Sequence, residues 1–389
     1  MTISIVLTVL LLFFITLAVF SFLLNGLLLK FSKTLGIRNN NETVIRWSAT
    51  SKPALGGISF FICFLISVAG YAVFFGEINP LYHDKQLFGL LVSAGIAFLM
   101  GLSDDAYNTK PFLKLLIQIV CGIILIFSGI YISMFENNMF NYILTVFWVV
   151  GMMNSINMLD NMDAITSVVS FFIILTIIVL VFVHSYQPEK EFKLANFSIL
   201  HLLVMVGVLA SVTGFLFYNW HPSKIFMGDT GSQFLGVYLA AIGIMFFWNG
   251  DTLNGRDSTL PSLGMEEKTK NIITVMLAFI IPIVDTTTVT LNRILRGQSP
   301  FVGGRDHTTH SLSYLGFSDD QVAWMFAGIS LLSFVFILLI NNLTERWNYS
   351  YLLLFISYFL IVFFILFGCT RVEKVKEKIQ KQEKKNNLS

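Results

Sequence analysis

The stretch ISIVLTVLLLFFITLAVFSFLLNGLLL, residues 3–29, indicates the class of protein to which the chain belongs. It carries no charge and is long enough to cross the hydrocarbon core of a bilayer as a single helix. It is longer than the apolar part of a signal peptide, and it has neither a basic residue before it nor a small-residue cleavage pattern. The stretch therefore predicts a spanning helix that is not cleaved off.

The rest of the chain has the same character. Of its 389 residues 55% are hydrophobic and 12% are charged, and the mean hydropathy is +0.75, which is typical of an integral membrane protein. Ten further apolar stretches of spanning length cover residues 55–75, 87–103, 112–133, 140–158, 162–183, 197–217, 232–249, 271–291, 321–340 and 350–368. We therefore expect an all-α integral membrane protein with eleven transmembrane helices, as one polytopic domain over residues 1–368 and a basic tail at 369–389.

The distribution of basic residues predicts the orientation. With eleven spans the termini lie on opposite sides, and 18 of the 25 Lys and Arg residues fall on the side of the tail. Cytoplasmic loops are the ones enriched in these residues, so we expect the amino terminus outside and the carboxyl terminus inside. The tail is either a helix lying on anionic lipid or a solvated run of charge.

Two classes of site are disfavoured by composition. The net charge of +2 is too small to indicate a nucleic-acid partner. The three cysteines all lie inside apolar runs, which favours buried spectator thiols over disulfides or a Cys-based metal site.

With this orientation, four polar clusters fall on the cytoplasmic side. They are GLSDDAYNTKPFLK (101–114), NSINMLDNMDA (154–164), NWHPSKIFMGDTGSQFLG (219–236) and GGRDHTTHSL (303–312). The sequence thus predicts an active site on the cytoplasmic face.

In the first cluster, Asp104 and Asp105 end a spanning segment. Carboxylates at a membrane boundary usually line a polar cavity or bind a cation, and the alternative is a solvated loop.

In the second cluster, polar residues recur every three positions, so neighbouring members such as Asn157 and Asp160 share a helix face. Their amide and carboxylate oxygens suit a hard cation such as Mg²⁺. A helix end capped by Asn and Asp is the alternative.

The third cluster places Asp229 between two glycines, Gly228 and Gly231, where a new helix begins. Such a turn presents backbone N–H groups to an anion and suits phosphate, provided that a metal ion lies between phosphate and carboxylate. Phe226 offers a face on which a base could stack, although a Phe here is more often lipid-facing or core. An N-cap by Asp229 or Ser232 would explain one polar residue but not the glycines.

The fourth cluster places His307 and His310 three apart, beside Arg305. A zinc site would need further ligands at suitable spacing. Contacts to phosphate fit the other clusters better, and a solvated pair of histidines is the alternative.

These motifs, together with PALGG at 53–57, resemble the polyprenyl-phosphate N-acetylhexosamine-1-phosphate transferases, glycosyltransferase family 4, over residues 46–317. Members are multi-pass membrane enzymes that move a sugar-1-phosphate from a UDP-sugar to a lipid phosphate and release UMP. The resemblance implies as substrates a UDP-N-acetylhexosamine and undecaprenyl phosphate in the bacterial cytoplasmic membrane. It also implies Mg²⁺ as cofactor, with Mn²⁺ as a substitute, and is compatible with a homodimer.

The resemblance also implies roles for individual residues. Asp229 would bind Mg²⁺, with Asn157 as a second ligand. Asp104 and Asp105 match paired aspartates that orient or deprotonate the lipid phosphate, and Lys114 matches a lysine that holds phosphates. Asp160, Asn219 and Phe226 match positions that line the uridine and nucleotide-sugar pocket. The remaining predicted substrate contacts, which follow from the chemistry of the residues themselves, are Gly228, Arg305, His307 and His310.

Some positions depart from the family pattern. Asn161 and Ala164 stand where glycines are usual, and Thr309 interrupts the usual His-x-His-His. Before PALGG only Arg46 remains of a basic motif, with Ser48 at its histidine position. The histidine departure argues against the phospho-N-acetylmuramoyl-pentapeptide transferases of peptidoglycan synthesis. The stretch GDTGS at 228–232 and the inferred cytoplasmic tail point instead to the branch that starts other surface glycans, such as lipopolysaccharide O-antigen and teichoic acid, with UDP-N-acetylglucosamine as the expected donor.

The expected chemistry is direct attack of the lipid phosphate on the sugar-side phosphorus, assisted by Asp105 or Asp104. Mg²⁺, Lys114 and Arg305 would neutralise the anions. A covalent aspartyl-phosphate route is the alternative. A secondary transporter is the rival from another class, but it predicts an inverted repeat and sites at mid-bilayer, whereas these clusters lie at one end of the helices.

Overall fold

The computed structural model describes residues 3–32, 52–75, 85–185, 196–250, 264–299, 304–342 and 349–372 and residue 375. Over these ranges the regular structure is helical apart from one isolated β-bridge, between Ala54 and Phe226. The prediction of an all-α membrane protein is confirmed. Arg46, Ser48 and the tail beyond Val372, except Val375, lie outside the described residues.

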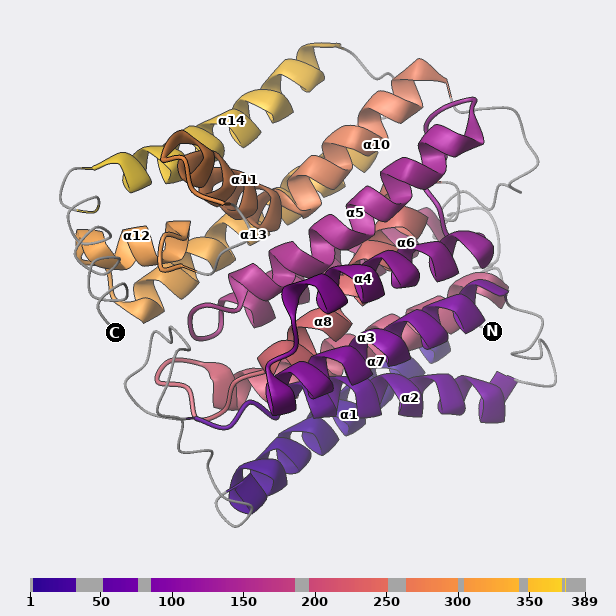
Figure 1. The fold of residues 1–389 in the computed structure, drawn as a ribbon. Helices are drawn as coiled ribbons and strands as arrows, with labels where there is room; N and C mark the ends of the chain where they lie inside the picture. The colour runs from indigo at the N-terminus through magenta and orange to yellow at the C-terminus, as the bar shows by residue number, and fades with distance from the viewer. Residues whose placement is uncertain are drawn as a thin grey trace.

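Most of the helices lie side by side in one bundle (Figure 1). They are α1 Ile3–Ser32, α2 Gly56–Phe75, α3 Lys85–Tyr107, α4 Pro111–Phe127, α5 Asn138–Leu159, α6 Ile165–Ser185, α7 Asn196–Asn219, α8 Gly228–Gly243 continued by the π-helix η2 Ile244–Trp248, α10 Met265–Ala278, α11 Ile280–Leu295, α12 Thr308–Leu315, α13 Asp319–Asn342 and α14 Tyr349–Arg371. The start of α1 and the end of α14 lie at opposite ends of the bundle (Figure 1).

Nine helices among the described residues are long and apolar enough to cross a membrane. Two predicted spans differ. The one expected at 112–133 ends at Phe127, because Gly129 adopts a left-handed φ of +83° and the chain turns back. The one expected at 271–291 is two helices, α10 and α11, which meet at 75°. In a continuous helix the ring of Pro282 would clash with the carbonyl group of Ala278, four residues earlier, which explains the break.

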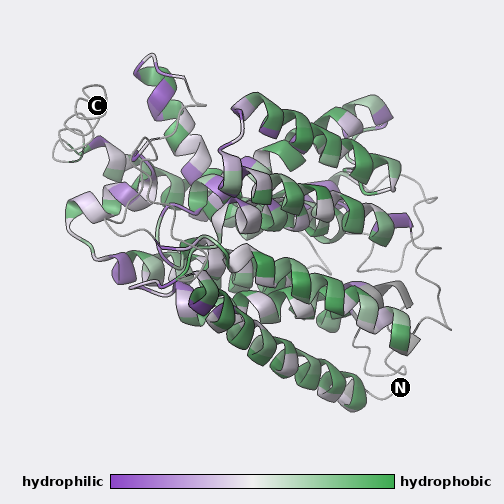
Figure 2. Cartoon of the chain, turned by 60° about the horizontal axis from the view of Figure 1, so that its bottom comes forward, coloured by the Kyte–Doolittle hydropathy of each residue, from purple (hydrophilic) through white to green (hydrophobic). Residues whose placement is uncertain are grey.

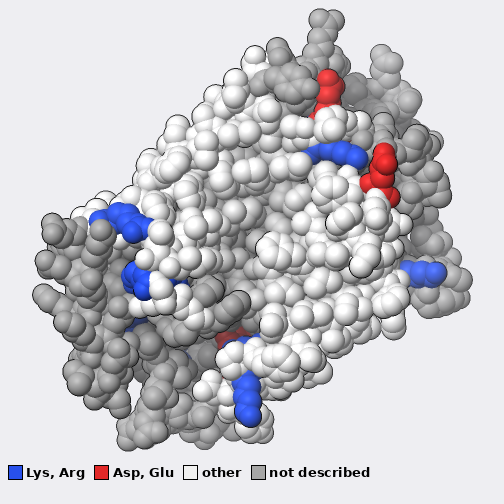
Figure 3. Space-filling view, turned by 45° about the horizontal axis from the view of Figure 1, so that its top comes forward, with Lys and Arg blue, Asp and Glu red and all other residues white. Residues whose placement is uncertain are grey.

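The helix α8 lies at the centre of the bundle. Every residue from Thr230 to Gly243 is buried, whereas α1 and α14 are mostly exposed. Apolar residues run along the helices and hydrophilic ones gather near their ends (Figure 2). One broad face is almost free of charge, with Lys, Arg, Asp and Glu toward its edges (Figure 3). This is the surface expected of a protein surrounded by lipid.

Two glycines let neighbouring helices touch the first turn of α8. A Cβ on Gly57 of α2 would lie 2.1 Å from the backbone nitrogen of Gly231, and one on Gly101 of α3 would lie 2.2 Å from the carbonyl oxygen of Asp229. Only glycine allows this approach, which brings the end of α3 onto the start of α8.

Candidate active site

The carboxylate of Asp105, near the end of α3, closes the amino terminus of α8. Its Oδ1 accepts a hydrogen bond from the N–H of Asp229 at 3.0 Å, and its Oδ2 accepts from the N–H and hydroxyl of Thr230 at 2.9 and 2.6 Å. It also faces the positive end of the helix dipole. These two amides are thus already paired, so the expectation that they cradle a substrate phosphate does not hold for them. No side chain of α8 itself forms the cap.

Gly228 is required where the carboxylate of Asp105 meets the amino terminus of α8. Its φ is +71°, in the left-handed region, and a Cβ there would lie 2.6 Å from the Oδ2 of Asp105. Its predicted contact with substrate stays a prediction.

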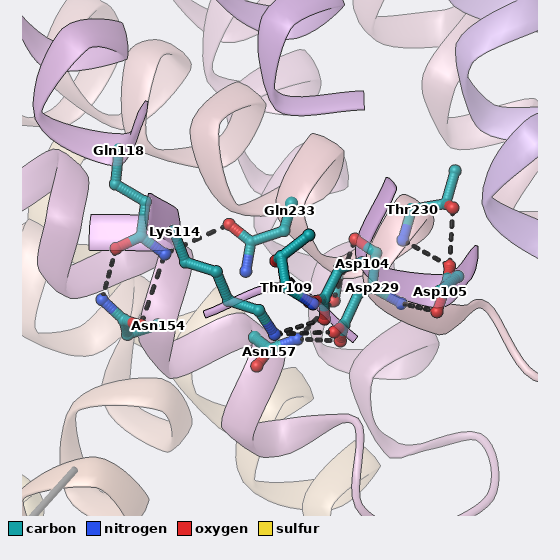
Figure 4. Close-up of polar contacts among 11 residues, drawn as sticks. Asp104, Asp105, Thr109, Lys114, Gln118, Asn154, Asn157, Asp229, Thr230 and Gln233 are labelled. Carbon is teal, nitrogen blue, oxygen red and sulfur yellow. Dashed lines mark hydrogen bonds and ion pairs between the residues drawn. The ribbon is translucent and has the colours of Figure 1, made fainter. Parts of the chain in front are cut away.

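Side chains from four helices meet at Asp229, in the first turn of α8 (Figure 4). The Nζ of Lys114, from α4, lies 3.0 Å from Asp229 Oδ2 and also pairs with Asp104 of α3. The Nδ2 of Asn157, from α5, donates to Asp229 Oδ1 at 2.5 Å and to the hydroxyl of Ser232 at 2.8 Å. Four residues singled out from sequence are therefore brought into one contact group.

Asp104 is fixed from its other side. Its Oδ1 accepts from the backbone N–H and the hydroxyl of Thr109, at 2.8 and 2.6 Å. The side chain is 4% exposed, whereas those of Asp229 and Lys114 are 28% and 25% exposed. Solvent or a ligand therefore reaches the site from the side of Asp229 and Lys114.

The segment before α2 lines the loop that precedes α8. The N–H groups of Gly56 and Gly57 donate to the carbonyls of Phe226 and Met227 at 3.0 Å, and the N–H of Phe226 donates to the carbonyl of Pro53 at 2.9 Å. This pairing holds the PALGG stretch against the predicted nucleotide pocket.

Phe226 lies partly exposed beside a cation that sequence reasoning missed. The Nζ of Lys52 sits 5.1 Å from the centre of its ring and donates to the hydroxyl of Ser223 at 2.8 Å. Lys52 also lies 3.7 Å from Asp163. A lysine beside a Pro-Gly-rich segment has no periodicity that would have marked it.

The turn between α5 and α6 is tied to the same loop. Asp163 accepts from the N–H and hydroxyl of Ser223, at 2.9 and 2.6 Å, and lies 3.0 Å from His221. Although burial opposes ionisation, the hydrogen bonds of Ser223, the charge of Lys52 and the bond to His221 lower the pKa of Asp163. This carboxylate is therefore a structural anion of the turn.

Asn219, predicted to line the nucleotide pocket, is 2% exposed. Its Oδ1 accepts from the N–H of Ala164 at 3.1 Å and from the hydroxyl of Ser167 at 2.9 Å, and its Nδ2 donates to the carbonyl of Ile225 at 3.2 Å. In this structure the side chain joins two loops. Ala164 has a φ of +66°, which explains why glycine suits that position.

Asp160 lies between these groups at the end of α5. Burial first, and then the nearby charges of Asp229, Asp105 and Asp163, raise its pKa well above the usual range. The structure thus places the predicted pocket residue within a concentration of negative charge. A cation or a hydrogen-bonding ligand would relieve it.

The histidine motif reaches the site through the α5–α6 turn. The hydroxyl of Thr309 donates to the Oδ1 of Asn161 at 2.7 Å. Nδ1 of His307 lies 2.9 Å from Asp285 Oδ2, and Asp285 Oδ1 accepts from the N–H and hydroxyl of Thr308. Two positions that depart from the family pattern, Asn161 and Thr309, therefore contact each other.

The other members of this motif are held more deeply. His310 is buried, and burial, with repulsion from His307, lowers its pKa to about 3. Asp306 forms a two-bond pair with Arg293 at 2.7 and 3.0 Å. Arg305, half-buried, accepts at its carbonyl oxygen a bond from the Tyr314 hydroxyl at 3.4 Å. The proposed phosphate contacts of these residues stay predictions.

Asp285 is a site residue that the sequence could have revealed. It is the sole charged residue of IIPIVDTTTV, residues 280–289, and an ionisable residue inside an apolar segment indicates a polar partner. The threonines that follow it, Thr286 to Thr288, carry no charge, so no charged cluster marks the position.

The donors around Asp229 fit a hard cation. Two carboxylates, from Asp104 and Asp229, flank a single ammonium group, and the Asn157 amide can turn its oxygen toward Asp229. Oxygen donors of this kind suit Mg²⁺. Among the described residues, a different group of His and Asp, Asp163 with His221 and Asp319, has atoms close enough to share an ion, but Ser223 already binds both oxygens of Asp163.

Comparison with known proteins agrees with this arrangement. The model of glycosyl transferase family 4 matches residues 87–247, the range from α3 to the π-helix. The chain is 29% identical over 320 residues to the probable undecaprenyl-phosphate N-acetylglucosaminyl 1-phosphate transferase of Bacillus subtilis, covering 80% of this chain and 78% of that protein. It is 30% identical over 264 residues to the phospho-N-acetylmuramoyl-pentapeptide-transferase of Limosilactobacillus reuteri, covering 62% of this chain and 75% of that protein. With the family motifs gathered at one end of a helical membrane bundle, the chain belongs to glycosyl transferase family 4, the polyprenyl-phosphate sugar-1-phosphate transferases.

Proposed function

We propose that this protein transfers N-acetylglucosamine-1-phosphate from UDP-N-acetylglucosamine to undecaprenyl phosphate at the cytoplasmic face of the bacterial cytoplasmic membrane. UMP is the second product. The observation that carries the proposal is the junction at Asp229, where Lys114, Asn157 and Asp104 converge at the mouth of a membrane bundle. A soluble nucleotide and a lipid-bound phosphate can both reach that depth.

The choice of sugar rests on similarity. The match to the probable N-acetylglucosaminyl 1-phosphate transferase spans 80% of this chain, whereas that to the Limosilactobacillus reuteri pentapeptide transferase spans 62%. The interrupted histidine motif supports the same choice. UDP-N-acetylmuramoyl-pentapeptide is the second candidate donor, since the shorter match has a similar identity.

The reaction joins two anions. An oxygen of the lipid phosphate attacks the sugar-side phosphorus of the UDP-sugar, the bond to the UMP oxygen breaks, and a lipid diphosphate-sugar forms. Bound Mg²⁺, held by Asp229 and Asn157, would supply positive charge at the diphosphate. Lys114 lies within 3.0 Å of Asp229, so its ammonium is placed to neutralise the attacking phosphate or the leaving group.

In this reaction Asp104 and Asp105 mainly hold other groups of the site in place. Asp104 holds the Lys114 ammonium, and Asp105 holds the first turn of α8. Both oxygens of each carboxylate are engaged, which favours direct attack by the lipid phosphate over a covalent intermediate on either aspartate. A phosphate nucleophile is already ionised near neutral pH and does not depend on a strong base.

The test uses detergent-solubilised protein, undecaprenyl phosphate and a panel of UDP-sugars, with UMP release measured and the lipid product identified by mass. We expect UMP release and an N-acetylhexosamine diphospholipid with UDP-N-acetylglucosamine. A product formed only from UDP-N-acetylmuramoyl-pentapeptide would establish the second candidate instead. No product from any donor would refute the proposed function.

The role of Asp229 is tested by Asp229→Asn, which keeps the shape but removes the charge. We expect turnover to fall by about 10²-fold or more across a Mg²⁺ titration, because charge stabilisation of the transition state is lost. Folding should persist, since α8 is capped by Asp105 and not by Asp229. Near-normal turnover at ordinary Mg²⁺ would overturn the metal assignment.

A further inference from the structure

Three carboxamides from three helices, two of them buried, form a hydrogen-bonded group beside Asp229 and its partners (Figure 4). The Nε2 of Gln118, from α4, donates to the Oδ1 of Asn154 of α5 at 3.3 Å and to the Oε1 of Gln233 of α8 at 3.2 Å. The Nδ2 of Asn154 returns a bond to the Oε1 of Gln118 at 2.8 Å. Gln118 is thus the centre of a carboxamide triad.

Each member of the triad lies one helical turn from a residue of the junction. Gln118 follows Lys114 by four positions, Gln233 follows Asp229 by four, and Asn154 precedes Asn157 by three. Residues at these spacings share a helix face. Because α4 and α8 begin at the junction and α5 ends there, all three carboxamides lie on the inner side of it.

Two members of the triad are buried where water cannot replace a lost partner, and Asn154 is partly buried. Gln118 and Gln233 are each 1% exposed. An unpaired polar group in such a place is costly, so sliding or rotating one of the three helices is opposed by all the bonds. The junction alone cannot fix the helices as well, because the Lys114 ammonium ends a flexible four-carbon stem.

We propose that the carboxamide triad Gln118–Asn154–Gln233 is the positioning element that sets the relative register of α4, α5 and α8, and with it the placing of Lys114, Asn157 and Asp229. The inference rests on the proposed function for its effect on catalysis. The triad does not touch substrate. It acts through the three residues one turn above it.

The test distinguishes positioning of the catalytic residues by the triad from the general loss of stability that an unpaired buried amide causes. In the single variant Gln118→Met, the amides of Asn154 and Gln233 lose their shared partner, so both stability and turnover should fall. In the triple variant Gln118→Met, Asn154→Leu, Gln233→Met, no amide is left unpaired, and replacing all partners by apolar groups of similar shape restores most of the stability.

In that triple variant we expect kcat to stay about 10- to 100-fold below wild type, as a small misplacement of reacting groups produces. The melting temperature should return toward that of wild type. Recovery of kcat together with stability would show that the triad is only a structural contact and would overturn the inference.

A matched control is Asn141→Leu, at the far end of α5. Asn141 is also a buried amide, 1% exposed, and accepts from the N–H groups of Met134 and Phe135 at 3.1 and 2.8 Å. We expect it to lower the melting temperature without lowering the kcat of the folded fraction. An equal loss of kcat in the control would contradict a special role for the triad.

A readout independent of turnover distinguishes this inference from the proposed function. A trifluoromethyl label on Lys110→Cys, exposed at the start of α4, in a Cys369→Ser background, should give one ¹⁹F resonance in the otherwise wild-type protein and a shifted or split one in the triple variant. If the wild-type protein forms no product from any UDP-sugar, the proposed function fails and the ¹⁹F spectrum alone decides. An unchanged spectrum in the triple variant would then refute the positioning role.

Discussion

The cap that Asp105 places on α8 can be tested by Asp105→Asn. In the structure the carboxylate accepts three hydrogen bonds, from the N–H of Asp229 and from the N–H and hydroxyl of Thr230. An asparagine offers only one acceptor oxygen there. Its NH₂ group must then face either Asp229 N–H or the two donors of Thr230.

The expected loss follows from these contacts. In the better orientation one backbone N–H of α8 is left unpaired, which costs about 1–3 kcal/mol. Removal of a charge from the helix amino terminus adds about 0.3–1 kcal/mol. Asp105→Asn should therefore lower the free energy of unfolding by about 1.3–4 kcal/mol.

The assay is thermal melting in detergent, with UMP release measured on the same samples. Thr230→Val removes one donor but leaves both amides paired, so we expect a smaller loss of about 1 kcal/mol. Ser103→Ala is the control in the same turn of α3. Ser103 is exposed and bonds only within its own helix, so the change should stay within about 0.5 kcal/mol.

The order of the melting temperatures of the three variants shows whether Asp105 stabilises α8 as its cap. If Asp105→Asn melts like Ser103→Ala, the carboxylate does not hold α8 and the capping account is wrong. If Asp105→Asn melts normally but releases no UMP, Asp105 takes part in the reaction directly.

Gly57→Ala should destabilise the protein by about 1–3 kcal/mol, since its Cβ would lie 2.1 Å from the nitrogen of Gly231, and normal melting would contradict the close packing of α2 on α8. For the orientation, Glu136→Cys should react with an impermeant thiol reagent on intact cells and Lys110→Cys only after lysis, because they lie in exposed loops at opposite ends of α4; the reverse pattern would place the site outside. Chelator-washed protein should hold no stoichiometric zinc, and zinc that is lost in His307→Ala would refute a phosphate role for the histidine motif.

The membrane class, the approximate spans and the clusters that lie together at one end could all be predicted from the amino-acid sequence. These features depend on composition and on positions along single helices. Apolar length alone decides whether a segment can span a bilayer. The meeting of Lys114, Asn157 and Asp229 could also be anticipated, because alternate spans return polar ends to the same side.

The partner that each polar group takes could not be predicted from the sequence and became visible in the fold. The fold assigned Asp105 to the amides of α8, made Asn219 a bridge between loops and joined Gln118 to Gln233 across 115 positions of sequence. The bend of 75° between α10 and α11, just before Pro282, was likewise visible only in the three-dimensional structure. Hydrogen bonds between helices depend on the rotation and register of both partners, and these are set by packing of the whole bundle rather than by the period of any one helix.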